Sequence, residues 1–365
     1  MVEKVVIAGF NARNVVRSAR MAGWEVISLA RYCDEDLKLY SSKSFCFLQP
    51  DLDKLVALCQ NYRAPVLLST GFEYFLNELR RKVDVLGSFN PVCLDKLRFA
   101  RELERAGIDT PETKTTPDIP GKIVVKKRFG GGGVDSFLIS GGDNLDKMVG
   151  GEYIFQEFVE GKPVSAIVIS DGRDARCLSI NEILSGWKQM NAKDFLYSGN
   201  ITPFTDRDDR DACKKIARIA ESVAILFDVR GCCGVDLILS SDGIYVLELN
   251  PRIPGSLDSF EMSTGKNLFA MHVKAADGAG ISAGVVEEVR FERYALRAVY
   301  YARSKLRAYI PPASPFFADI PGWGEEIERG SPVTSIISTG SSRDEVVSKA
   351  LSRKMMLENE FLKLM

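Results

Sequence analysis

The chain contains a single histidine, His272, among 365 residues. Histidine is the commonest metal ligand and the usual base beside a nucleophilic serine or cysteine. Sites built from several histidines are therefore excluded, and Ser-His-Asp or Cys-His chemistry would have to run through this one residue. It lies in the stretch NLFAMHVKAA, whose apolar residues recur with a helical pattern. We expect His272 to be a hydrogen-bonded core or boundary residue.

Cysteine spacing typical of a metal site is also missing. The eight cysteines are scattered singly, except for the adjacent pair Cys232 and Cys233, and no second pair completes a zinc site. A chain of this length can bury a core large enough to fold without disulfides. We expect buried free thiols in a reducing compartment.

A large charge imbalance and long apolar runs are absent as well. The formal net charge is −1, which argues against nucleic-acid binding through a broadly basic surface. No run reaches the ~18 apolar residues of a membrane span. The start, MVEKVVIAGF, lacks the basic region and long apolar core of a signal peptide. These absences predict a cytoplasmic protein with neither nucleic acid nor membrane among its partners.

The first ninety residues alternate between apolar runs and amphipathic stretches. Strands are expected at 5–9, 24–30, 44–48, 66–70 and 84–88, with helices at 14–23, 51–62 and 73–82. This alternation predicts an open parallel α/β sheet. The first turn has only Gly9 and no G-x-G-x-x-G fingerprint, so a dinucleotide site has little support. Asn11 and Arg13 follow the first strand, where such sheets bind anions, although ordinary loop polarity explains them equally well.

The most informative stretch is GVDLILSSDGIYVLELNPRIPGS, residues 234–256. It predicts two strands joined by a tight turn. Period-two alternation sends Glu248, Asn250 and Arg252 to one face, and Asp236 on the partner strand points at the same space if the register permits. Two carboxylates and an amide oxygen are hard ligands that suit Mg²⁺. The alternative is a hairpin with one solvated face.

A second stretch, IVVKKRFGGGGV at 123–134, runs from a buried strand through Lys126 into four consecutive glycines. Such a run loses more backbone entropy on folding than any other and packs no side chain. Backbone N–H groups that must approach a phosphate closely would explain it. The alternative is a flexible surface loop.

Between these stretches lies YIFQEFVEGKPVSAIVI, residues 153–169, an apolar strand, a polar linker and a second apolar strand. The order of lysine strand, glycine loop, QEFVEG and D…ELNPR resembles the ATP-grasp superfamily of carboxylate-amine and carboxylate-thiol ligases. Asp95-Lys96, at the start of a predicted helix, is similar to the opening of many ATP-grasp nucleotide domains. The resemblance covers roughly residues 94–260.

The resemblance implies a nucleotide site. The residues that it assigns to the ATP phosphates are Lys96, Lys126 and the backbone N–H groups of Gly130, Gly131, Gly132 and Gly133. In the linker, the carbonyl of Glu157 and the N–H of Val159 would meet adenine, with Phe158 between them. The acidic residue that holds the ribose in many relatives is replaced here by Lys162-Pro163-Val164, which leaves Glu160 as the candidate.

The resemblance also implies roles for the hairpin. Asp236, Glu248 and Asn250 would hold Mg²⁺, with Mn²⁺ as the alternative ion. Arg252 would stabilise the tetrahedral oxyanion, and Lys126 would assist phosphoryl transfer in addition to binding ATP.

The expected fold class is mixed α/β and α+β in three parts. An N-terminal open parallel α/β domain (1–93) precedes a central ATP-grasp domain (94–285). A small β-rich C-terminal module with a final helix (286–365) follows, similar to that of biotin-carboxylase-like enzymes.

The expected function is an ATP- and Mg-dependent ligase. It would activate a substrate carboxylate as an acyl phosphate and join it to an amine, giving amide, ADP and phosphate. Its partners would be a small-molecule carboxylate and amine, and a homodimer stays open because dimers are common among such ligases. The alternatives are a bicarbonate-activating carboxylase, a non-catalytic ATP-binding regulatory protein and, with least support, a dehydrogenase.

Overall fold

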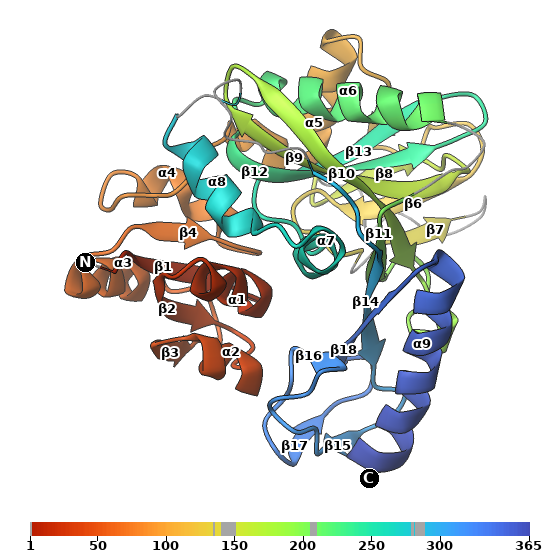
Figure 1. The fold of residues 1–365 in the computed structure, drawn as a ribbon. Coiled ribbons are helices and arrows are strands. Elements are labelled where there is room, and N and C mark those ends of the chain that lie inside the picture. The colour runs from red at the N-terminus through yellow and green to blue at the C-terminus, as the bar shows by residue number, and fades with distance from the viewer. Residues whose placement is uncertain (1, 134–135, 140–150, 205–209, 279–280, 282–288) are drawn as a thin grey trace.

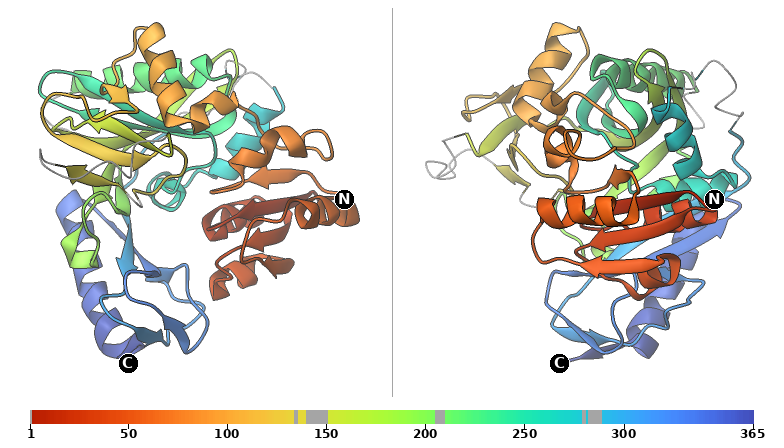
Figure 2. Two further views of the ribbon diagram at one scale, coloured as in Figure 1. Left: turned by 180° about the vertical axis from the view of Figure 1, so that it is seen from behind. Right: turned by 90° about the vertical axis from the view of Figure 1, so that its left-hand side faces the viewer.

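A computed structural model describes residues 2–133, 136–139, 151–204, 210–278, 281 and 289–365. Figure 1 shows a first region in red and dark orange and a C-terminal region in blue, both lying below a central region that runs from light orange through yellow and green to cyan. Figure 2 shows the same arrangement from two further sides.

The first region is a four-stranded parallel sheet in the order β3-β2-β1-β4. The strands are β1 (Lys4–Gly9), β2 (Glu25–Ala30), β3 (Lys43–Cys46) and β4 (Val66–Leu68). The helices are α1 (Arg13–Met21), α2 (Glu35–Tyr40), α3 (Leu52–Tyr62) and α4 (Leu76–Leu79), the last preceded by a 3₁₀ turn at Glu73–Phe75. The predicted open parallel α/β sheet is confirmed.

The strand predicted at 84–88 does not form. Val85 makes an isolated parallel bridge to Val66, and Ser88 makes an antiparallel bridge to Arg230 in the central region. The segment therefore leaves the first sheet after one bridge and connects it to the next region.

The central region begins with α5 (Lys96–Arg105), which Asp95 caps by accepting hydrogen bonds from the backbone N–H groups of Leu97 and Arg98. A small sheet follows in the order β5-β8-β6-β7. Its strands are β5 (Thr113–Lys114), β6 (Ile123–Lys127), β7 (Phe137–Ile139) and β8 (Tyr153–Glu157).

A large antiparallel sheet runs through the rest of the chain in the order β13-β12-β9-β10-β11-β14-β18-β16. Its central strands are β9 (Lys162–Asp171), β10 (Ala175–Ser185), β11 (Tyr197–Thr202), β12 (Arg230–Leu239) and β13 (Ile244–Asn250). Its C-terminal strands are β14 (Tyr294–Tyr301), β16 (Phe317–Ala318) and β18 (Pro332–Gly340). The expected boundary between 285 and 286 lies outside the described residues, and the sheet continues across it.

Alternation along β9 determines which helices cover the sheet. Val164, Ala166 and Val168 belong to a core shared with α6 (Arg210–Leu226). Ile167 and Ile169 belong to a core shared with α7 (Leu257–Thr264), α8 (Leu268–Ala276) and α1 of the first region. In Figure 1, α6 accordingly lies on the outer face, and α7 and α8 lie between the large sheet and the first region.

The C-terminal region adds a three-stranded sheet, β17-β15-β19, formed by Glu325–Ile327, Leu306–Ala308 and Leu362–Leu364. The predicted final helix is α9 (Arg343–Met356), whose N-cap Ser342 accepts a hydrogen bond from the N–H of Glu345. Among the described residues, no helix has the length and apolar character needed to span a membrane.

Arg13 joins the first region to the other two. Its side chain is only 2 % exposed and donates to both oxygens of Asp258 in α7, at 2.9 and 2.5 Å, and to Asp319 at 3.0 Å. Asp36 accepts from the backbone N–H groups of Asp319 and Ile320. The anion that Arg13 meets is therefore the protein's own carboxylates.

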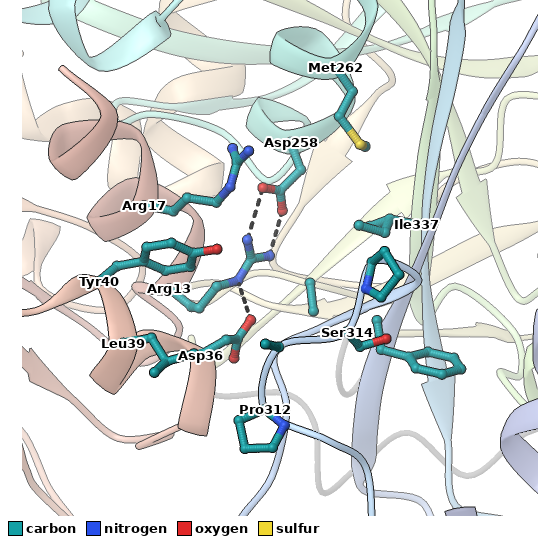
Figure 3. Close-up of a pocket in the computed structure, with 14 residues that line it drawn as sticks. Arg13, Arg17, Asp36, Leu39, Tyr40, Asp258, Met262, Pro312, Ser314 and Ile337 are labelled. Carbon is teal, nitrogen blue, oxygen red and sulfur yellow. Dashed lines mark hydrogen bonds and ion pairs between the residues drawn. The ribbon is translucent and has the colours of Figure 1, made fainter. Parts of the chain in front are cut away.

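A pocket of about 300 Å³ lies beside this junction. Figure 3 shows Arg13, Arg17 and Asp258 on one side and Pro312 and Ile337 on the other.

The cysteine prediction is wrong for one pair. Cys33, after β2, and Cys46, at the end of β3, form a disulfide with a Cα–Cα distance of 6.0 Å. Sequence spacing gives no indication of this pair, because the parallel pairing of β2 and β3 brings the two residues together. The other six cysteines form no disulfide; four of them are buried, as expected, and Cys177 and Cys213 are partly buried.

His272 is a satisfied core histidine, as predicted. Its Nδ1 accepts the N–H of Cys232 at 2.8 Å, which leaves the proton on Nε2, 3.3 Å from the carbonyl oxygen of Leu86. A Cβ on Gly231 would lie 2.5 Å from the ring, so a glycine is needed there. Burial lowers the pKa of His272 to about 4.

We predict that the single histidine of this chain does not titrate in its usual range. The imidazole C–H resonance should hold its neutral-form chemical shift from pH 8 to about 5, because burial disfavours the cation. Between the unfolded pKa of about 6.5 and the folded value, only the unfolded chain binds the proton, so His272 should cost up to about 3 kcal/mol of stability as the pH falls. A His272→Gln variant assigns the resonance, and a titration midpoint near 6.5 would contradict the buried geometry.

Candidate active site

The β12–β13 hairpin forms with the register that a shared site requires. Asp236 and Glu248 are directly paired across the two antiparallel strands, so their side chains lie on the same face. Asn250 pairs with Gly234, and its amide nitrogen donates to Asp236 at 3.0 Å. The structure therefore brings together the three residues that the sequence assigns to a metal.

Electrostatics set these carboxylates apart from an ordinary solvated face. Desolvation, together with the nearby charge of Glu248, raises the pKa of Asp236 to about 7, and Arg252 and Lys126 act in the opposite direction. Because the negative charge of Asp236 is disfavoured beside Glu248, a cation bound between them would stabilise it.

Two lysines approach the pair from other elements. Lys126, on β6, donates to the side-chain oxygen of Gln156 at 2.6 Å. Desolvation lowers the pKa of Lys126 to about 8, and Lys96 acts in the same direction, while Glu248 and Asp236 oppose it. Lys96, at the start of α5, lies 3.9 Å from Glu248 and donates to the carbonyl oxygen of Gly130.

The glycine loop lies beside the hairpin, with Gly130, Gly131 and Gly132 exposed and Gly133 partly buried. Gly130, Gly132 and Gly133 have φ of +112°, +75° and +71°, a region that favours glycine. A Cβ on Gly133 would lie 1.9 Å from the carbonyl oxygen of Phe195, and a Cβ on Gly131 would lie 3.5 Å from Glu248. The backbone conformation therefore favours glycine at 130, 132 and 133, and packing excludes a side chain at Gly133.

The linker after β8 is anchored to the small sheet. Glu157 donates its N–H to the carbonyl of Glu112, and Phe158 donates its N–H to the carbonyl of Lys122, both at 2.9 Å. The ring of Phe158 lies 6.3 Å from that of Phe195, whose backbone also touches the glycine loop. Val159 and Glu160 follow without regular structure, and Glu160 is exposed.

Arg252 is held by two acceptors. Its Nε donates to Glu73 at 2.5 Å, and its NH2 group donates to the side-chain oxygen of Asn250 at 3.0 Å. Asn250 thus bridges Arg252 and Asp236. Because its oxygen faces Arg252, its role as a metal ligand stays a prediction.

Glu73 and Tyr74 were missed by the sequence reasoning. Both come from the turn after β4, and the Tyr74 hydroxyl accepts the N–H of Gly130 at 2.8 Å. Their position at the carboxyl end of a parallel strand is a signal that could have found them, since ligands bind at that edge.

The donor set fits Mg²⁺. The described residues contain no group of three histidine, cysteine or acidic side chains that could hold a metal by themselves. Two carboxylates beside an amide would therefore need further oxygen ligands. Mg²⁺ usually binds in this way, through one or two carboxylates with phosphate and water oxygens.

Comparison with known proteins agrees with this geometry. Residues 93–256 match the family model described as an ATP-grasp domain. An uncharacterised protein of Methanocaldococcus jannaschii is 25% identical, and the match covers 92% of this chain and 88% of that protein. The 3-methyl-D-ornithine–L-lysine ligase of Methanosarcina mazei is 24% identical, over 78% of this chain and 72% of the ligase.

Solved structures show the same fold. The biotin carboxylase domain of Hydrogenobacter thermophilus 2-oxoglutarate carboxylase, solved with MgADP, ADP and bicarbonate, aligns with a TM-score of 0.76 and 18% identity. The alignment covers 100% of this chain and 92% of that one. N5-carboxyaminoimidazole ribonucleotide synthetase from Thermotoga maritima aligns over all of both chains, with a TM-score of 0.71 and 17% identity.

The family match covers the lysine strand, the glycine loop, the linker and the acidic hairpin in one domain, and the solved structures share the surrounding fold. Residues 93–256 form an ATP-grasp domain.

Proposed function

We propose that the protein is an ATP- and Mg-dependent ligase that activates a substrate carboxylate as an acyl phosphate and joins it to an amine. The products would be an amide, ADP and phosphate. The observation that supports this most is the pairing of Asp236 with Glu248 beside Lys96, Lys126 and the glycine loop. We keep the three-part division, 1–93, 94–285 and 286–365, as part of the proposal.

ATP binding would involve groups from α5, β6, the glycine loop and the linker after β8. Lys96, Lys126 and the N–H groups of the glycine loop (Gly130–Gly133) would neutralise and orient the phosphates. The backbone of Glu157 and Val159 would meet adenine, with Glu160 placed for the ribose. Phe195 supports this assignment, because it contacts both the linker and the loop.

Asp236 and Glu248 would hold Mg²⁺ or Mn²⁺, with Asn250 beside them. A bound ion would supply positive charge to the phosphate oxygens during transfer. Lys126 would take part in that step through its own charge, because its short contact with Gln156 fixes the ammonium group in place.

Arg252 would stabilise the oxyanion that forms when the amine attacks the acyl phosphate. Hydrogen bonds to Glu73 and Asn250 fix its guanidinium before substrate arrives. Attack by the amine nitrogen forms the C–N bond and releases phosphate.

The amide-forming reaction is supported by the ligases among the relatives, one of them aligned over 78% of this chain. The similarity to biotin carboxylases is a similarity of fold. A bicarbonate-activating reaction therefore remains the second outcome of the assay described next. A homodimer is also only proposed, since one similar structure is described as a dimer.

The test of this proposal is phosphate release from Mg-ATP with pooled carboxylates, amines and bicarbonate. Release that depends on a carboxylate together with an amine supports the ligase. Release that depends on bicarbonate supports the carboxylase. Nucleotide binding without release under any condition would support a regulatory protein.

We predict that Glu248→Gln removes turnover. The loss should exceed the roughly 10- to 100-fold typical of removing an outer-shell partner of a metal ligand. The fold should survive, since the substitution preserves shape and relieves repulsion with Asp236. Phosphate release and thermal unfolding measure the two effects. Glu328→Gln, an exposed position in the C-terminal region, is the matched control, and near-normal activity of Glu248→Gln would remove Glu248 from the site.

We predict that ATP affinity declines above about pH 8. In the free protein Lys126 has a pKa of about 8, so the ammonium that binds phosphate is lost as the pH rises through that value. The dissociation constant should increase by up to about tenfold per pH unit. Lys126→Arg keeps its charge and should flatten this dependence, whereas an equally steep profile in that variant would assign the titration to another group.

A further inference from the structure

One turn of the first region contacts both Arg252 and the glycine loop of the candidate site. It follows β4 and runs from Gly71 to Tyr74. Gly71 has φ +91°, and a Cβ there would lie 2.4 Å from the ring of Phe10. Phe72 is fully buried, with its ring 5.3 Å from that of Phe47 and 5.7 Å from that of Phe75. The turn is therefore fixed by its own packing, and its polar side chains have a rigid base.

Glu73 uses both carboxylate oxygens. One accepts the N–H of Gly71 at 2.5 Å, and the other accepts Nε of Arg252 at 2.5 Å. The side chain of Glu73 is 8% exposed and that of Arg252 is 15% exposed. Because Glu73 is itself held by the turn, it fixes the direction in which the Arg252 guanidinium points.

Tyr74 extends from the same turn to the glycine loop. Its hydroxyl accepts the N–H of Gly130 at 2.8 Å, and its ring packs edge-on against Phe129 at 6.4 Å. Lys96 binds the carbonyl oxygen of the same glycine. Both the N–H and the carbonyl oxygen of Gly130 are thus hydrogen-bonded, to Tyr74 of the first region and to Lys96 of the central region.

The Gly130 N–H is also one of the groups that the proposed function assigns to the ATP phosphates. A single N–H in this position cannot serve the Tyr74 hydroxyl and a phosphate oxygen with full strength at once. A phosphate would therefore compete with Tyr74 for it.

We propose that Glu73 and Tyr74 are a pair of positioning residues: Glu73 orients Arg252 for the second step, and Tyr74 holds the glycine loop until nucleotide displaces it. The inference rests on the proposed function. It means that nucleotide binding releases the turn from the glycine loop while its contact with Arg252 remains. The first region would thereby respond to nucleotide binding through Tyr74, while Glu73 would keep Arg252, the group that stabilises the oxyanion, in place.

Calorimetric titration with Mg²⁺ and AMP-PNP, an ATP analogue that resists hydrolysis, tests the Tyr74 half. Tyr74→Phe keeps the ring contact with Phe129 and removes only the competing hydroxyl. It should bind the analogue about fivefold more tightly, the effect of one typical net hydrogen bond. Structural damage would weaken binding instead. Tyr300→Phe, which removes a hydroxyl bonded to Glu358 in the C-terminal region, is the control and should leave affinity unchanged.

The Glu73 half is tested by separating affinity from turnover. Glu73→Ala should bind the analogue as the wild type does but lose turnover about as severely as Arg252→Ala, and the double variant should lose little more than either. Glu73→Gln still offers an oxygen to Arg252 and should recover part of the rate. Loss of nucleotide affinity in Glu73→Ala, or a normal rate, would overturn this role.

Failure of this inference can be told apart from failure of the proposed function. A wild-type chain that does not bind Mg²⁺ and AMP-PNP would refute the proposed function. A wild-type chain that binds them with the same or higher affinity than Tyr74→Phe would refute the role of Tyr74 and leave the ligase intact.

Discussion

The candidate site depends on two carboxylates, Asp236 and Glu248, that are paired across the antiparallel strands of the β12–β13 hairpin. Asp236 and Glu248 lie side by side and are both partly buried, and desolvation together with the charge of Glu248 raises the pKa of Asp236 to about 7. Such a pair is stable only with positive charge around it. Each nearby cation comes from a different element: Lys96 from α5, Lys126 from β6 and Arg252 from the segment after β13.

The other regions hold these elements in place. Arg13, Asp258 and Asp319 tie the first sheet to α7 and to the C-terminal region through a buried ionic network. The large sheet is continuous from β13 to β16, so the C-terminal strands belong to the same sheet as the β12–β13 hairpin. Glu73 then brings the first region into direct contact with Arg252.

Sequence periodicity was sufficient to predict the first sheet and the shared face of the hairpin residues. Alternation of strand and helix predicted the parallel first sheet, and the period-two pattern of residues 246–252 placed Glu248, Asn250 and Arg252 on one face. The glycine run predicted backbone N–H groups that approach a phosphate, and this stays a prediction; the structure shows that a side chain at Gly133 would collide with Phe195. The first sheet and the shared face depend on residues that are close in the sequence, so the local sequence pattern is enough to predict them.

Features that depend on distant parts of the chain were not predicted. Glu73 and Arg252 are separated by 179 positions, and only the docking of the first region onto the hairpin makes them neighbours. The Cys33–Cys46 disulfide follows from the pairing of β2 with β3. The segment 84–88 has the composition of a strand, but its end bridges to Arg230 instead of extending the first sheet. In each case tertiary contacts decided the outcome.

The most direct measurement of the central claim is a crystal structure of the chain with ADP and Mn²⁺, in which the ion is located by anomalous scattering. The account predicts an anomalous peak within bonding distance of Asp236 and Glu248, with the ADP phosphates under the glycine loop and beside Lys126. A nucleotide bound elsewhere, or an ion that does not touch this pair, would contradict it.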